Sequence, residues 1–81
     1  MTIYLDILRA LEACRGFLLP EPTLLNDLRL TRMPPPTVTE FRAAIETLES
    51  RRLVTSVRSD LGGPIKWRIT DAGRGELAAN N

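Results

Sequence analysis

The fold of this 81-residue chain is decided by one stretch, Leu53-Val54-Thr55-Ser56-Val57-Arg58-Ser59-Asp60-Leu61-Gly62-Gly63-Pro64-Ile65-Lys66-Trp67-Arg68-Ile69. Its two ends, residues 53–58 and 65–69, are rich in β-branched and aromatic side chains, and the second alternates apolar and polar residues without a break. Both features are typical of β-strands. The two glycines and the proline between them supply the backbone angles of a hairpin loop longer than two residues. The stretch therefore predicts an antiparallel hairpin.

A helix is predicted directly upstream of this hairpin, because the chain there reads Thr37-Val38-Thr39-Glu40. These residues form a capping box, in which the Thr37 hydroxyl and the Glu40 carboxylate each accept a hydrogen bond from an otherwise unpaired backbone N–H. Pro36 and Phe41 occupy the positions of a hydrophobic staple. We expect the helix to begin at Val38, to end near Arg51 and to bury one stripe made of Phe41, Ala44, Ile45 and Leu48.

Two more helices are predicted before this one. Apolar residues at helical spacing indicate an amphipathic helix over about residues 3–15, and we expect Gly16 to end it in a left-handed cap with Phe17 as the apolar contact. A second, shorter helix is expected over about residues 22–30 and is ended by three prolines at 34–36. Its apolar positions are Leu24, Leu25, Leu28 and Leu30.

A last short helix is predicted after the hairpin, over about residues 71–78. Thr70 and Asp71 can cap its first turn, and Gly73 and Gly75 weaken it by nearly 1 kcal/mol each relative to alanine. The fold class expected is α+β, with three helices, a two-stranded hairpin and a C-terminal helix. At 81 residues, with 43% of them hydrophobic, one compact core is possible and a second is not, so residues 1–81 are expected to form a single domain.

The composition excludes several kinds of chemistry. The chain has no histidine and one cysteine, Cys14, so histidine-dependent triads, histidine-ligated zinc, thiolate metal sites and an internal disulfide are ruled out. Glu46 and Glu49 lie three residues apart on an exposed helix face, without the burial that a catalytic pair needs. We therefore expect no enzyme activity, no metal and no cofactor. Cys14 is expected to be a small buried side chain.

The protein is also expected to be cytoplasmic. A lone cysteine fits a reducing compartment. Charged side chains interrupt the N-terminal segment early, so we expect no signal peptide and no contact with a membrane.

The order of elements and two motifs resemble a winged helix-turn-helix domain. Ile45-Glu46-Thr47-Leu48-Glu49-Ser50-Arg51-Arg52-Leu53-Val54 is similar to the recognition helix and first wing strand of MarR-like and PadR-like bacterial regulators. Trp67-Arg68-Ile69-Thr70-Asp71-Ala72-Gly73-Arg74-Gly75-Glu76-Leu77 resembles their aromatic-x-Leu-Thr-x-x-Gly-x-x-x-Leu signature. Arg52 stands where a glycine is usual, and the additional dimerisation helices are absent, which leaves a homodimer as an open alternative. The resemblance implies a small transcriptional regulator of bacterial or phage type that binds double-stranded DNA.

The net charge of +1 is divided unevenly along the chain. Residues 37–50, which include the third helix, carry a net charge of −2, whereas residues 51–68 carry a net charge of +4. The basic residues of the second segment are Arg51, Arg52, Arg58, Lys66 and Arg68. The hairpin is therefore expected to be a basic wing.

DNA binding predicts a role for two sets of residues. Helix positions that face away from the apolar stripe would enter the major groove: Thr39, Arg42, Ala43, Glu46 and Thr47. On a two-residue period, Arg58, Lys66 and Arg68 are expected to share an outer face, opposite Val57, Ile65, Trp67 and Ile69, and to contact phosphates or a minor groove. Further phosphate contacts are expected from Arg29, Arg32, Arg51 and Arg52. If all five basic residues of segment 51–68 contacted phosphates, a plot of log K for DNA binding against log salt concentration would have a slope of about −4 to −5.

A second hypothesis is a winged helix that binds another protein and no DNA. Its contact surface would be the acidic face of the third helix or the apolar loop residue Leu61. Trp67 is open to two interpretations, an exposed ring that stacks on a base or a core residue. Its place in the apolar stripe of the second strand favours the core.

Overall fold

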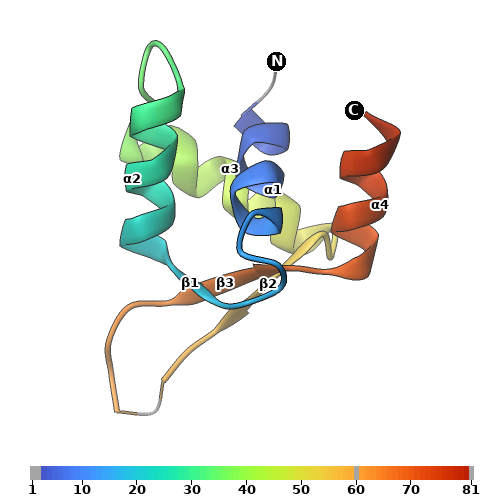
Figure 1. Ribbon diagram of the computed structural model, residues 1–81. Coiled ribbons are helices and arrows are strands. Elements are labelled where there is room, and N and C mark those ends of the chain that lie inside the picture. Colours follow the sequence, from blue (N-terminus) through green and yellow to red (C-terminus); the bar gives the residue numbers. More distant parts are fainter. Residues whose placement is uncertain (1–2, 60, 81) are drawn as a thin grey trace.

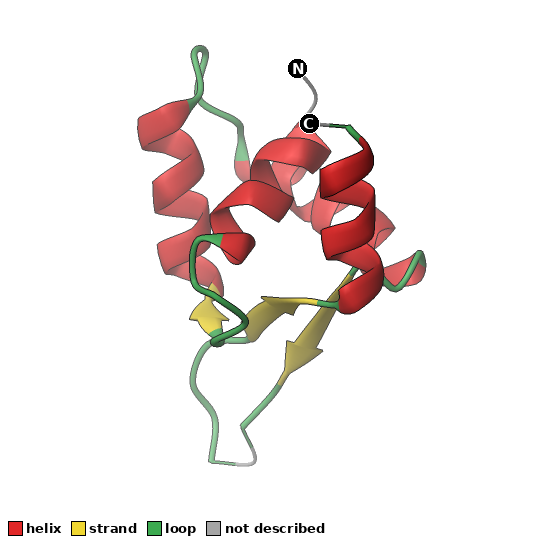
Figure 2. Cartoon of the chain, turned by 45° about the vertical axis from the view of Figure 1, so that its right-hand side comes forward, coloured by secondary structure: helices red, strands yellow, loops and turns green. Residues whose placement is uncertain are grey.

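Three helices stand side by side on one face of a small antiparallel sheet, and a fourth crosses behind them (Figure 1). The computed structural model describes residues 3–59 and 61–80. Its elements are α1 (Ile3–Glu12), β1 (Leu19–Pro20), α2 (Glu21–Thr31), α3 (Val38–Ser50), β2 (Val54–Val57), β3 (Lys66–Ile69) and α4 (Asp71–Ala79). The crossing helix is α3. The hairpin formed by β2 and β3 projects away from the helices, and α1 begins and α4 ends at the opposite end of the molecule (Figures 1 and 2).

The α+β class and the four helices agree with the prediction, but the sheet has three strands rather than two. Their order is β1-β3-β2, so β3 is the central strand. Leu19 lies opposite Trp67, and Pro20 lies opposite Lys66. Because β1 has only two residues, it leaves no periodic pattern in the sequence. Its proline lies on an edge strand, where a missing N–H is tolerated.

The core is built around α1, which contacts α2, α3, α4 and β3. Fully or almost fully buried side chains come from every helix and from both hairpin strands. They include Ile7, Leu8, Leu11, Leu24, Leu28, Phe41, Ile45, Leu48, Val54, Trp67 and Ile69. Trp67 is only 3% exposed, which confirms its place in the core. The basic hairpin is therefore attached to the helices by its apolar inner face.

The capping box at the start of α3 is present as predicted. The Glu40 backbone N–H donates to Thr37 Oγ1 over 3.1 Å, and the Thr37 N–H donates to Glu40 Oε1 over 3.2 Å. The helix begins at Val38, and both Pro36 and Phe41 are buried. The local sequence thus sets the first turn of α3 before any long-range contact is considered.

Two predictions at the end of the first helix are wrong in detail. Helix α1 ends at Glu12 rather than near residue 15, because the N–H groups of Cys14 and Arg15 donate to carbonyls three residues back rather than four. The backbone is then left-handed at Arg15 (φ 53°) as well as at Gly16 (φ 85°). Phe17 is 76% exposed rather than packed against the helix as the apolar contact of the cap. In α2, Leu24 and Leu28 are buried, but Leu30 falls on the outer side of the helix and is 77% exposed.

The register of the hairpin also differs from the prediction. Val57 lies opposite Lys66 and Thr55 opposite Arg68, so these four side chains share the outer face of the sheet. Val57 is 43% exposed, as this position requires. The prediction that Arg58 shares a strand face with Lys66, opposite Val57, is wrong. Because the loop comprises residues 58–65, Arg58 follows the last residue of β2 and lies outside the ladder.

One corner joins the end of α3, the sheet and α4 by backbone contacts. The Thr70 N–H donates to the Leu53 carbonyl oxygen over 3.1 Å, and the Thr70 hydroxyl donates to the Arg52 carbonyl over 2.7 Å. Thr70 Oγ1 also accepts from the Gly73 N–H over 3.0 Å, which caps α4 as predicted. A Cβ on Gly73 would lie 2.1 Å from the Leu53 carbonyl oxygen. Only glycine allows α4 to approach β2 so closely.

We predict that Gly73→Ala and Gly75→Ala change stability in opposite directions, although both residues lie in α4. Gly73→Ala is expected to reduce the free energy of unfolding by about 2–3 kcal/mol, because the new methyl group meets a backbone carbonyl that cannot move away cheaply. Gly75 has no atom within 4 Å of a built Cβ, so Gly75→Ala should raise stability by about 0.5–1 kcal/mol. Urea unfolding measures both, and equal gains in the two variants would refute the close approach.

Candidate functional site

The outward face of α3 carries most of the helix residues singled out in the sequence. Thr39, Arg42, Ala43 and Glu46 line a shallow hollow together with Val38. Thr47 is also exposed. The opposite side of the helix is buried in the core through Phe41, Ala44, Ile45 and Leu48. The structure therefore presents these polar positions to solvent as one continuous face.

Most polar groups of α3 already have partners within the protein. The Thr47 hydroxyl donates to the Ala43 carbonyl over 2.9 Å, and Glu40 belongs to the capping box. Glu49 is more than a solvated helix residue, because its Oε2 accepts from the Ser56 hydroxyl over 2.6 Å and so ties α3 to β2. Glu46 makes no ion pair or hydrogen bond with the described residues. It is the negative charge at the centre of the exposed face.

Arg42 is held by a residue that the sequence did not reveal as part of the site. Its Nη2 lies 2.8 Å from Glu21 Oε2, at the start of α2. The other carboxylate oxygen, Glu21 Oε1, accepts from the indole N–H of Trp67 over 3.2 Å. Glu21 therefore links α2, α3 and β3. No local pattern predicts this, because Glu21 and Trp67 are 46 residues apart in the chain.

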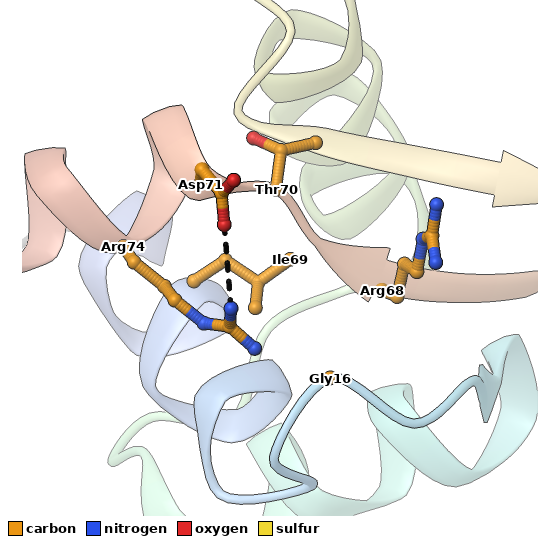
Figure 3. Close-up of a pocket in the computed structure, with 6 residues that line it drawn as sticks. All are labelled: Gly16, Arg68, Ile69, Thr70, Asp71 and Arg74. Atoms are coloured by element: carbon orange, nitrogen blue, oxygen red, sulfur yellow. Dashed lines mark hydrogen bonds and ion pairs between the residues drawn. The ribbon is translucent and has the colours of Figure 1, made fainter.

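Basic side chains of the hairpin are free of such pairing. Arg58, Lys66 and Arg68 are exposed, and none forms an ion pair with a described residue. Lys66 and Arg68 extend from the outer face of β3. Arg68 lines a hollow at the start of α4, where Arg74 is directed toward Asp71 and Arg68 points away from that pair (Figure 3). The hairpin thus offers three cationic groups to solvent.

The four arginines suggested as additional phosphate contacts have different surroundings. Arg29 is exposed near the end of α2. Arg32 forms an ion pair with Asp6 of α1, so its charge is compensated within the protein. Arg51 lines a groove between α1 and α4, together with Tyr4, Leu5, Leu8, Leu48, Leu53, Glu76 and Asn80.

Arg52 has a strained backbone, with φ 61°, at the turn into β2. Arg68 lies opposite Thr55, which is three residues along the chain from both Arg52 and Arg58. The Thr70 hydroxyl donates to the Arg52 carbonyl, so Arg52 lies beside the end of β3. Of the five basic residues of segment 51–68, three belong to the hairpin and two lie at its base.

Other expectations can be compared with the structure directly. Leu61, at the hairpin loop, is 99% exposed. Cys14 is half-buried rather than buried, with its Sγ 3.7 Å from the Ala10 carbonyl oxygen. Within residues 3–59 and 61–80, no three cysteine or acidic side chains gather into a group that could hold a metal ion. None of the helices described here is both long and apolar enough to cross a membrane.

Comparison of the chain with protein-family models, with curated proteins and with solved structures gives no match. The function must therefore be argued from the residues of this chain.

We predict that the hydrogen bond from the Ser56 hydroxyl to the Glu49 carboxylate holds the hairpin against α3. Ser56→Ala should lower the free energy of unfolding by about 1–2 kcal/mol, because a half-buried carboxylate loses a short hydrogen bond. Ser50→Ala is the matched control, since the Ser50 hydroxyl donates only to Thr47 of its own helix, over 3.1 Å. It should change stability by less than about 0.5 kcal/mol. Thermal unfolding followed by circular dichroism distinguishes the two, and an equal loss in both would contradict this role.

Proposed function

We propose that the protein binds double-stranded DNA as a small transcriptional regulator of the winged helix-turn-helix type. Helix α3 would enter the major groove, and the hairpin would contact neighbouring phosphates. The observation that carries the proposal is a set of three cationic side chains, Arg58, Lys66 and Arg68, on a hairpin that follows α3 directly. None of the three forms an ion pair with a residue that the structure describes. The proposal involves no catalytic step and no cofactor. It places the protein in the cytoplasm, where a lone thiol stays reduced.

The order and pairing of the elements support a winged helix. A short strand, β1, lies between α1 and α2 and pairs with β3, and the hairpin follows α3. The two motifs that resemble bacterial regulators fall on α3 with β2 and on β3 with α4. In such a domain the helix before the wing reads the major groove. The 13 residues of α3 make a rod about 20 Å long, and the major groove is wide enough to admit it.

Electrostatics favour phosphate binding by the hairpin over base reading by the helix. Phosphate contacts supply most of the sequence-independent affinity for DNA, and they need cations that are not already neutralised. The hairpin has three such cations. The α3 face has Arg42, which is paired with Glu21, and the unpaired Glu46, which repels phosphates but can accept from a cytosine amino group. We infer that the hairpin supplies affinity and that α3 supplies shape and a few base contacts.

The salt dependence of binding gives a quantitative test. If three hairpin cations neutralise phosphates, log K against log salt should have a slope of about −3, and Arg58→Gln or Arg68→Gln should each reduce its magnitude by about 0.9. A slope of about −4 to −5 is expected instead if Arg51 and Arg52, at the base of the hairpin, also neutralise phosphates. Fluorescence anisotropy of a labelled duplex at several KCl concentrations measures it.

Arg9→Gln is the matched control for these variants, because it removes the same charge from α1, where Arg9 pairs with Asp6. Its slope should equal that of the unchanged protein. Charge reversal at Arg58 and Arg68 together should abolish binding while circular dichroism shows an intact fold. Affinity that does not respond to salt would end the proposal.

A protein-binding domain is the second candidate, and two observations favour it. Glu46 has no partner among the described residues at the centre of the α3 face, and Leu61 exposes almost its entire side chain at the hairpin loop. An acidic face of this kind would bind a basic protein.

An NMR titration with random duplex DNA at low salt distinguishes the two candidates. DNA binding predicts amide shifts confined to residues 38–50 and 54–69, where the proposed interface lies. A spectrum that does not respond to duplex, together with specific capture of a basic protein by this chain and loss of that capture in Glu46→Gln, would favour the protein-binding domain.

A further inference from the structure

Glu21 is fixed from three directions at the point where three elements meet. Its backbone N–H donates to the Ile65 carbonyl oxygen over 2.8 Å, which anchors the start of α2 beside β3. Its side chain is 18% exposed, and each carboxylate oxygen has a separate partner, the indole N–H of Trp67 and the guanidinium of Arg42. The two partners differ in burial, because Trp67 lies in the core and the Arg42 side chain is 48% exposed. Arg42 can therefore leave Glu21 without disturbing the core, whereas Trp67 cannot.

Arg42 is the one basic residue of α3, and DNA would offer it the same chemistry that Glu21 offers. A guanidinium binds carboxylates, phosphates and the O6 and N7 acceptors of guanine through the same parallel N–H groups. In the free protein Glu21 Oε2 already accepts a hydrogen bond from Nη2 of this guanidinium. A half-exposed ion pair contributes little to stability, so a DNA acceptor can compete for it.

We propose that Glu21 is an internal competitor for DNA. It holds Arg42 in the free protein and gives it up to a phosphate or guanine acceptor when a duplex binds to α3. When Arg42 leaves, Glu21 keeps its hydrogen bond from Trp67 and its partial access to water, so no buried carboxylate is left without a partner. Glu21 thereby lowers the affinity of α3 for any duplex, and Arg42 is the residue through which it acts. This inference rests on the proposed DNA binding.

Glu21→Gln distinguishes the hydrogen bond from Trp67 from the ion pair with Arg42. The amide oxygen of glutamine can still accept from Trp67 Nε1, but the amide nitrogen cannot accept from Arg42. The variant is therefore expected to fold normally, which circular dichroism and the emission of the single tryptophan verify. It should bind a labelled duplex about two- to fivefold more tightly than the unchanged protein, because the duplex no longer has to displace an ion pair. If Arg42 reaches a phosphate, replacing Arg42 by glutamine in the Glu21→Gln background should reduce the magnitude of the salt slope by at least about 0.9.

A double-mutant cycle with Arg42→Gln shows whether Glu21 acts through Arg42. Removal of the Glu21 charge alone reduces repulsion of any phosphate, so some gain in affinity could arise without Arg42. We expect Glu21→Gln to tighten binding by less than half as much, in fold-change, when Arg42 is already glutamine. Equal gains in both backgrounds would overturn the proposal, since Glu21 would then act by charge alone. No gain in either background would overturn it as well.

The same titrations distinguish failure of this inference from failure of the proposed function. If the unchanged protein and Arg9→Gln bind duplex with the expected salt slope while the cycle shows no coupling, only the role of Glu21 is refuted. If the unchanged protein and Glu21→Gln both fail to bind duplex at low salt, DNA binding and the role of Glu21 are refuted together.

Discussion

The arrangement of the whole chain depends on β3 as the central strand of the sheet. Its backbone pairs with β1 on one side and with β2 on the other, so segments from the beginning and the end of the chain meet on it. Its inner face supplies Trp67 and Ile69 to the core, and its outer face carries Lys66 and Arg68. Alternation along four residues thus separates the part of the hairpin that holds the helices from the part that faces solvent. A one-residue change of register would bury the two cations and expose the tryptophan.

Local signals in the sequence predicted most helices and strands. The features that these signals missed depend on contacts between residues far apart in the chain. The capping box at Thr37 and the alternation around Trp67 act over a few residues, and both features appear as expected. The two-residue strand β1 exists because β3 offers it a partner 46 or more residues away, which no local pattern records. The hairpin register depends on where an eight-residue loop closes, and this placed Val57 rather than Arg58 beside Lys66. Prediction of the α3 face succeeded because helical periodicity alone determines which side chains point outward.

The exposure of the candidate residues was predictable from the sequence, but their electrostatics and the part played by Glu21 were not. Sequence counting gives segment 51–68 a net charge of +4, yet it cannot show that Arg32 and Arg42 are neutralised by Asp6 and Glu21. It also cannot show that Arg51 faces a groove between α1 and α4. What matters for an anionic partner is the number of cations without internal partners, and that number depends on contacts between residues far apart in the chain. Ion pairing removes Arg32 and Arg42 from that number, whereas no basic residue of segment 51–68 forms an ion pair with a described residue.

The start of α1 and the end of α4 lie at the end of the molecule away from the hairpin (Figure 1). The tight contact between Gly73 and the Leu53 carbonyl fixes the direction in which α4 leaves the sheet. A linker, fluorescent label or surface attachment joined at the start of α1 or the end of α4 is therefore attached at the end of the molecule away from the hairpin. The domain can be immobilised or fused through both ends and still present its basic strand face to a large, extended ligand.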